Sequence, residues 1–565
     1  MAAPRRGSEC AWWALGALVL VVACAAPAHA QARRVAVLDF TNSGRDAALE
    51  WLGPAVAETV TTKLHAIRAL QLVERLQLYR VLQEQKLNLT DIVDPSQAIR
   101  VGKLVGAEQV VLGGHSAFGG TVRFTARFVD TATGAIVATS QVNGILDAKN
   151  PASLWTAVDQ LAQAVIDSLN TRVAVGGRIE PTPEEKARLA AVPTQSLEAQ
   201  EVYGRGLAAY RKHEWADAAH EFGRATSLHP QFAQAWERLA LVLIDLGRFP
   251  EALRAAERAR DLSTSAGDQR GQAAALDYIG RVHSSQARYA DALAAYGQGL
   301  RLAERLGDQV KQAEDLVGIG SVHSSQGRYA DALSAYGRSL QIAERLGDEP
   351  LQARILVANG IVHAERGRFA EALGDFQRGL RLAERIGDVP RQATALNNMG
   401  AVHSSQRRYS EALTYFEQSL RLTERLGFEA LQARALGNIG NLHQLQGRYA
   451  DGLSYQEQAL RLTVKLGDEE FQAATLGNIG SILLQQGRHA DALSYYERSR
   501  ALAEKLGDPA VEARALANMA LTYSAQGRSA DARSAIDRAL AIADRIGMER
   551  TQLRQIRDSI LRQGR

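Results

Sequence analysis

Residues 309–347 read QVKQAEDLVGIGSVHSSQGRYADALSAYGRSLQIAERLG, and closely similar stretches recur every 40 residues through the second half of the chain. Each copy ends in a glycine that is usually followed by aspartate; these glycines are Gly267, Gly307, Gly347, Gly387, Gly427, Gly467, Gly507 and Gly547. No residue is inserted or lost between copies. Such a period predicts a solenoid, whose units bury apolar side chains against their neighbours. Solenoids display long surfaces, so binding is favoured over catalysis.

Each repeat is predicted to form two antiparallel helices. Gly320 in the first helix and Ala332 in the second allow close approach, and Tyr336 fills the remaining space between units. Gly347 suits the left-handed residue that ends a helix. Asp348 suits the N-cap of the next helix. The predicted fold class is therefore mainly α, an α-solenoid.

This order of residues resembles the tetratricopeptide repeat, in the longer form known from kinesin light chains. The matching glycines are Gly280, Gly320, Gly360, Gly400, Gly440 and Gly480, with Ala520 substituting. The matching small residues are Ala252, Ala292, Ala332, Ala372, Ala412, Ala492 and Ala532, with Gly452 substituting. About nine repeats are expected over residues 196–547, the first two being shorter, and residues 548–565 are expected to form a capping helix. The resemblance implies a concave groove that binds a protein or peptide.

Residues 33–170 predict a small α/β domain instead. Short β-branched runs predict strands at 34–40, 70–74 and 109–112, the last ended by Gly113-Gly114. Alternation over 122–129 and 136–142 predicts an antiparallel hairpin. Apolar residues at helical spacing predict helices at 49–64, 76–85 and 154–169, and another beginning near Pro95. Residues 171–195, which carry Gly176-Gly177, Pro181, Pro183 and Pro193, are expected to be a linker.

Four motifs in this domain resemble the amino-terminal domain of TolB and related domains of the curli-secretion lipoprotein and a flagellar outer-membrane assembly protein. They are VAVLDF at 35–40, VER at 73–75, GAEQVVLGG at 106–114 and FVDTATG at 128–134. These motifs contain no catalytic signature. The long alternating insert that forms the curli pore has no counterpart here.

The first thirty residues predict an export signal. Arg5 and Arg6 precede an apolar run, and Ala28-His29-Ala30 fits a signal-peptidase site that would leave Gln31 as the first residue. Residues 21–24, VVAC, resemble a bacterial lipobox, so an alternative is lipidation of Cys24, which would tether the protein to a membrane, with the outer membrane as the candidate. A third reading is an uncleaved anchor. The protein is accordingly expected in the periplasm.

The composition and the missing motifs argue against several classes of function. The net charge of +4 on 128 ionised side chains is too small to indicate nucleic-acid binding. The only cysteines, Cys10 and Cys24, lie within the signal, so thiolate chemistry and disulfides are not expected in the exported form. No phosphate-binding loop, zinc-protease motif or dinucleotide fingerprint occurs. We therefore expect no cofactor and no enzymatic activity.

Two columns of first-helix residues are the candidate peptide-binding site. They are Asn398, Asn438, Asn478 and Asn518, and Arg354, Arg434 and Arg514. Asparagine can hold a peptide backbone through both donor and acceptor, or it can bond to the adjacent repeat. The arginines can pair with an acidic ligand or remain solvated.

Two further features favour structure over chemistry. The histidine column occupies the family's packing position rather than a metal site, because imidazoles on stacked helices lie too far apart to share an ion; its members are His283, His323, His363, His403 and His443. The stretch 114–118 lacks the last glycine of a hydrolase elbow, so Ser116 is not expected to be a nucleophile.

Two functions agree with these patterns. The first is a cell-envelope adaptor that binds proteins or peptides through its repeats. The alternative is a regulatory protein whose α/β domain senses a signal and whose repeats relay it to a partner. The sequence identifies neither the ligand nor the oligomeric state.

Overall fold

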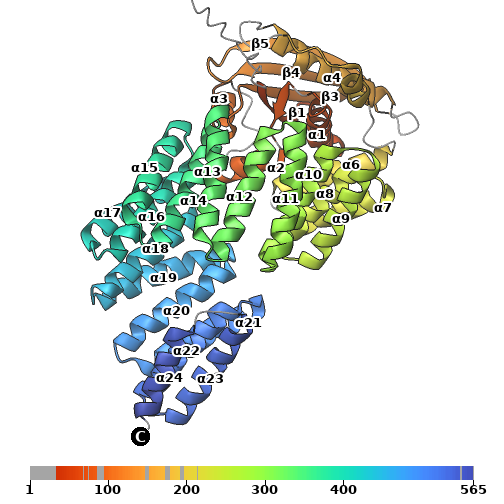
Figure 1. Cartoon of the computed structure of the whole chain (residues 1–565). Helices are drawn as coiled ribbons and strands as arrows, with labels where there is room; N and C mark the ends of the chain where they lie inside the picture. Colours follow the sequence, from red (N-terminus) through yellow and green to blue (C-terminus); the bar gives the residue numbers. More distant parts are fainter. Residues whose placement is uncertain are drawn as a thin grey trace, which may run out of the picture.

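The computed structural model describes residues 33–67, 69–73, 75–85, 95–146, 152–171, 178–190, 196–212, 214–546 and 550–563. The expected export signal, including Cys24 and the Ala30–Gln31 cleavage site, lies outside these residues. An α/β domain at one end is followed by paired helices, and the last repeats (blue) extend away from it (Figure 1). The predicted fold class is confirmed. Within the described residues, no helix has both the length and the apolar character needed to cross a membrane.

The α/β domain contains one five-stranded sheet in the order β2-β1-β3-β4-β5. Its elements are β1 (Arg33–Asn42), the 3-10 helix η1 (Ala47–Leu49), α1 (Leu52–Leu64), β2 (Leu70–Leu72), α2 (Arg75–Glu84), α3 (Pro95–Val105), β3 (Gln109–Phe118), β4 (Thr121–Asp130), β5 (Ile136–Ile145) and α4 (Ala152–Asn170). β1 is parallel to β2 and β3, whereas β3, β4 and β5 are mutually antiparallel. Because side chains alternate along β1, Val35 and Val37 face α1 and α4, while Ala36 and Leu38 face α2 and α3.

The prediction that Gly113-Gly114 ends a strand is wrong, since β3 continues through both glycines to Phe118. The ring of Phe40 lies over Gly113, where a Cβ atom would come within 2.3 Å of Phe40 Cδ1. Glycine here permits close packing inside a strand. The turn falls instead at Gly119-Gly120, where both residues have positive φ.

Nine helix pairs follow within the described residues from 197 to 546. They are α6 (Leu197–Arg211) with α7 (Trp215–Leu228), α8 (Ala233–Asp245) with α9 (Phe249–Ser265), α10 (Gln269–Ser285) with α11 (Tyr289–Leu306), α12 (Gln309–Ser325) with α13 (Tyr329–Leu346), α14 (Glu349–Glu365) with α15 (Phe369–Ile386), α16 (Val389–Ser405) with α17 (Tyr409–Leu426), α18 (Glu429–Leu445) with α19 (Tyr449–Leu466), α20 (Glu469–Gln485) with α21 (His489–Leu506), and α22 (Pro509–Ala525) with α23 (Ser529–Ile546). A final helix, α24 (Thr551–Gln563), packs through Leu553 and Ile560 onto the last pair.

The helix ends follow the predicted turn chemistry. Gly347 has a φ of 65° and ends α13, and the Asp348 carboxylate accepts a hydrogen bond of 3.0 Å from the Leu351 N–H at the start of α14. Phe428 replaces the aspartate before α18 and makes no side-chain cap. The unpaired N–H groups of a helix start explain why aspartate recurs at this position.

The stretch that we expected to be a linker contains a short helix, α5 (Pro183–Leu189). The Thr182 hydroxyl accepts from the Glu185 N–H, and the Glu185 carboxylate accepts from the Thr182 N–H, which together form a capping box. Lys63 of α1 donates to the Leu189 carbonyl at 2.5 Å. This segment therefore packs against the α/β domain.

In five long repeats the matching glycine of the first helix lies against an aromatic ring of the second helix, at Gly280, Gly320, Gly360, Gly400 and Gly480, whereas Gly440 lies against Gln456. A Cβ atom at Gly400 would lie 2.6 Å from Phe416 Cε1, and one at Gly320 would lie 2.5 Å from Tyr336 Cε1. Each glycine therefore admits a ring that a larger residue would displace.

Gly400→Ala is expected to lower the free energy of unfolding by about 1–3 kcal/mol, because the added methyl overpacks the Phe416 site. Gly374, on α15, is the matched control, since a Cβ there meets no atom within 4 Å. Gly374→Ala should stabilise by up to about 1 kcal/mol through helix propensity. Urea unfolding of both variants measures the difference, and equal effects of the two substitutions would contradict this packing.

Candidate ligand surface and domain interface

A buried ionic network joins the α/β domain to the first helices of the array. Arg75 of α2 pairs with Asp39 of β1, and its Nε lies 3.2 Å from Glu58 Oε2 of α1. Arg238 of α8 donates to Glu58 Oε1 at 2.7 Å, and Arg211 of α6 donates to Asp39 Oδ2 at 3.0 Å. Two carboxylates from the α/β domain thus share three guanidinium groups, two of which belong to the array.

Tyrosines complete this network. Tyr79 donates to Asp39 Oδ1 at 2.7 Å, and Arg238 donates to the Tyr278 hydroxyl of α10 at 3.3 Å. Burial lowers the pKa of Arg75, and burial raises the pKa of Tyr79. Because buried charges are stable only when paired, the network ties the positions of α1 and α2 to those of α6, α8 and α10.

Two contacts extend the interface to later repeats. Arg34 of β1 pairs with Asp348, and Gln85, which follows α2, donates to Asp388 Oδ1 at 3.1 Å. Both aspartates also cap their own first helices. Sequence reasoning predicted the capping and missed the domain contact. Pro350 and Pro390 stand two residues after these two aspartates and after none of the other capping aspartates, but a proline in the first turn of a helix does not by itself indicate a domain contact.

The asparagine column does not behave uniformly. Asn438 donates to Asn397 Oδ1 of the preceding repeat at 3.4 Å, and Asn397 donates to Ser419 Oγ at 2.9 Å. Asn438 therefore ties adjacent repeats together. The amide nitrogen of Asn398 is buried without a hydrogen-bond partner among the described residues.

Asn478 of α20 and Asn518 of α22 differ from Asn438. Both side chains are half-buried, and neither makes a side-chain hydrogen bond within the described part of the chain. Their amides consequently keep both donor and acceptor capacity for a ligand.

The three arginines are all exposed on first helices. The Arg434 guanidinium lies 6.0 Å from the Phe471 ring centroid, a cation–π contact between α18 and α20. Arg514 stands in the corresponding position on α22, two repeats further along, and Arg354 stands on α14. Arg434 and Arg514 belong to the same helices as Asn438 and Asn518.

The histidines take part in packing. His403 stacks on Tyr415 with ring centroids 5.3 Å apart, and His443 stacks on Tyr455 at 5.4 Å. In the described part of the chain, no group of three or more histidine, cysteine, aspartate or glutamate residues is placed to hold a metal ion. His115, beside Ser116, contacts the Phe40 and Leu49 carbonyls at 3.1 Å, and burial lowers its pKa.

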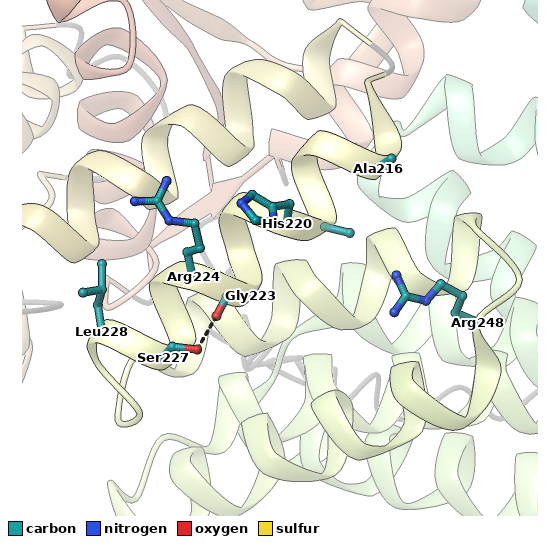
Figure 2. A pocket seen from close by; sticks show the side chains of 8 residues that line it. Ala216, His220, Gly223, Arg224, Ser227, Leu228 and Arg248 are labelled. Atoms are coloured by element: carbon teal, nitrogen blue, oxygen red, sulfur yellow. Dashed lines mark hydrogen bonds between the residues drawn. The ribbon is translucent and has the colours of Figure 1, made fainter.

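A hollow of about 690 Å³ opens between α7 and α9 (Figure 2). Its two arginines already pair with glutamates on their own helices: Arg224 with Glu221 at 3.2 Å and Arg248 with Glu251 at 2.6 Å. Ser227 donates to the Gly223 carbonyl. Among the described polar side chains that line the hollow, these pairings leave only His220, and a single polar side chain does not make a binding site, so we assign the hollow no ligand.

Comparisons with known proteins agree with this architecture. Tetratricopeptide repeat models match residues 231–305, 312–385, 351–425, 431–505 and 471–545, and a second such model matches 397–464. The model for the curli production assembly/transport component CsgG matches residues 19–127. No curated protein matches the chain.

Three solved structures are similar to this chain at low sequence identity. BtubC from P. vanneervenii is 20% identical, with 38% of this chain and 91% of that chain covered and a TM-score of 0.34. Apo RapI is 15% identical, with 48% and 100% covered and a TM-score of 0.40. Aspartyl phosphate phosphatase F from Bacillus subtilis is 10% identical, with 62% and 92% covered and a TM-score of 0.41.

The repeat models together span more than half of the chain, in register with the observed helix pairs. The chain therefore belongs to the tetratricopeptide repeat family, and it carries an amino-terminal domain of the curli-component type.

Proposed function

We propose that the chain is a non-catalytic adaptor of the bacterial cell envelope that binds a protein or peptide on the first helices of its last repeats. One observation carries the proposal. The α/β domain packs on the first helices α6 and α8 and reaches the starts of α14 and α16, whereas Asn478, Asn518, Arg434 and Arg514 lie beyond these contacts.

The chemistry of these residues indicates the kind of ligand. Half-buried amides can pair with the donors and acceptors of an extended backbone, and exposed guanidinium groups can pair with carboxylates. We therefore propose an extended peptide segment with acidic side chains. The curli-component domain and the predicted export signal support an envelope location, with release at Gln31 or lipidation at Cys24 as the two routes.

A peptide selected from a phage-displayed library against the wild-type chain provides the probe for a binding test. Asn478→Ala/Asn518→Ala is expected to weaken its affinity about thirtyfold, since each lost hydrogen bond contributes about 1 kcal/mol. The melting temperature should stay unchanged. Asn438→Ala is the control and should lower stability instead, because it removes the bond to Asn397. Full affinity in the double variant would reject the ligand role of these asparagines.

A regulatory function is the second candidate, and the interface favours it. Arg34 and Gln85 hold two separate repeats at Asp348 and Asp388, so a movement of the α/β domain would be transmitted to the array. Peptide binding that changes when Asp348→Asn/Asp388→Asn loosens these contacts would support this relay.

A further inference from the structure

The outer edge of β5 presents unpaired backbone groups. β5 is the last strand of the sheet, and its packing partners are β4 on one side and α4 on one face. The N–H of Leu146, which follows β5, donates to the Gly120 carbonyl at 3.2 Å. Hydrogen bonding alternates along an antiparallel pair. In this register Gly144 and Val142 bond to β4, so the N–H and C=O groups of Thr139, Gln141 and Asn143 point away from it.

These outward groups have no hydrogen-bond partner among the residues that the structure describes. The free segment ends at Ile145, whose N–H donates to Ser153 Oγ of α4 at 3.0 Å. It is interrupted at the other end, where the pairing with β4 shifts register between Phe128 and Val129. Thr139, Gln141 and Asn143 all have exposed side chains, and their outward backbone groups offer a short, regular set of hydrogen bonds to another strand.

The composition of β5 does not protect this edge. Its sequence, IVATSQVNGI, contains no charged residue and no proline over ten positions. Natural edge strands are commonly shielded by lysine, proline, a bulge or shortness, because an open edge recruits another strand. The opposite edge of the same sheet follows that rule, since β2 has only three residues.

We propose that β5 pairs antiparallel with β5 of a second copy of this chain, with the two-fold axis at Gln141. Only an axis at Gln141 pairs all three outward residues. Gln141 then lies opposite Gln141 of the second copy, and Thr139 lies opposite Asn143 of the second copy. Symmetric pairing places β5 opposite an identical strand, so a net charge on β5 would be repelled by the same charge on the second copy. β5 has none.

The pairing joins two sheets into one and holds two repeat arrays in a single particle. The evidence for this pairing comes from β5 alone, so the pairing does not depend on the ligand proposed for the array. Its functional consequence is bivalence, because a tethered second array meets a repeated ligand at high effective concentration.

A single cysteine tests the contact directly. The chain from Gln31 onward has no native cysteine. In a hydrogen-bonded antiparallel pair the two Cα atoms lie about 5.5 Å apart, within the range that a disulfide spans. Gln141→Cys is expected to form a covalent dimer under mild oxidation. Thr125→Cys is the matched control, because Thr125 is exposed on β4 between two neighbouring strands and should stay monomeric. Equal cross-linking of the two variants, or none at Gln141, would overturn the proposal.

Charged substitutions at Gln141 give a second test, which measures reversible dimerisation and needs no disulfide. By sedimentation equilibrium, the wild-type chain should dimerise, whereas Gln141→Lys and Gln141→Glu alone should each weaken dimerisation about fivefold through like charges at the axis. Mixing the two variants should restore dimerisation as a mixed pair. A monomeric wild-type chain, or dimerisation unaffected by both charges, would exclude self-pairing and leave a foreign strand or no strand as the occupant of this edge.

Discussion

Arg75→Met is expected to lower the free energy of unfolding by about 3–5 kcal/mol, because it leaves Asp39 and Glu58 buried with fewer partners. The Arg75 side chain is only 1% exposed, and its Nη1 also donates to the Val37 carbonyl at 2.7 Å. Methionine fills a similar volume, so the loss reports mainly on charge rather than on packing. Urea unfolding followed by circular dichroism measures it.

Two further variants separate charge from general damage. Arg488 pairs with Asp491 on the surface, and Arg488→Met should change stability by less than about 1 kcal/mol. Adding Glu58→Gln to Arg75→Met should recover part of the loss, because it removes one of the uncompensated carboxylates. A loss for Arg75→Met no larger than that for Arg488→Met would show that the buried network contributes little.

Asp315→Asn is expected to stabilise the protein by up to about 4 kcal/mol at pH 8 and by very little at pH 4. Asp315 of α12 is 0% exposed, and burial raises the pKa of its carboxyl to about 7. Lys311 lies 3.1 Å away but is shared with Asp277 at 3.2 Å, so it compensates the charge incompletely. Equivalent positions in the other long repeats are apolar or neutral: Ala275, Ile355, Ala395, Ala435, Thr475 and Ala515.

The sign follows from linkage. A carboxyl whose pKa is higher in the folded chain favours the fold while protonated, and this contribution is lost as the pH rises from about 4 through about 7. Melting temperatures of the wild type and the variant should therefore diverge across that window. Asp331→Asn, at an exposed pair with Arg328, should show no such divergence. A constant difference between wild type and Asp315→Asn at pH 4 and pH 8 would contradict the raised pKa.

The repeat array was predictable because the residues that end, start and pack its helices recur in each unit. Gly347 and Asp348 specify a helix end and a helix start locally, and a glycine–aromatic contact like that of Gly400 with Phe416 recurs at the same spacing in four other long repeats. The α/β domain was predictable to the level of its elements. The exception was β3, where Gly113 serves the packing of Phe40 and does not end the strand.

The domain interface could not be read from the sequence. Glu58 and Arg238 lie 180 residues apart, and no periodicity links them. The four asparagines occupy the same position on successive first helices, but their hydrogen bonds differ because their neighbours differ. Asn438 meets Asn397, whereas Gly437 and Gly477 stand at that position in the next two repeats. A shared position in a repeat therefore predicts a shared face and does not predict a shared hydrogen bond.

The central claim, that the last repeats hold a ligand on their first helices, is tested most directly by site-specific photocross-linking in intact cells that produce the chain. A benzophenone amino acid would replace Arg434 on α18, Arg514 on α22 or, as the control, Arg461 on the second helix α19; all three side chains are exposed. The account predicts cross-links to one and the same polypeptide from positions 434 and 514 and none from position 461. Cross-links of equal yield from all three positions, or from position 461 alone, would contradict it.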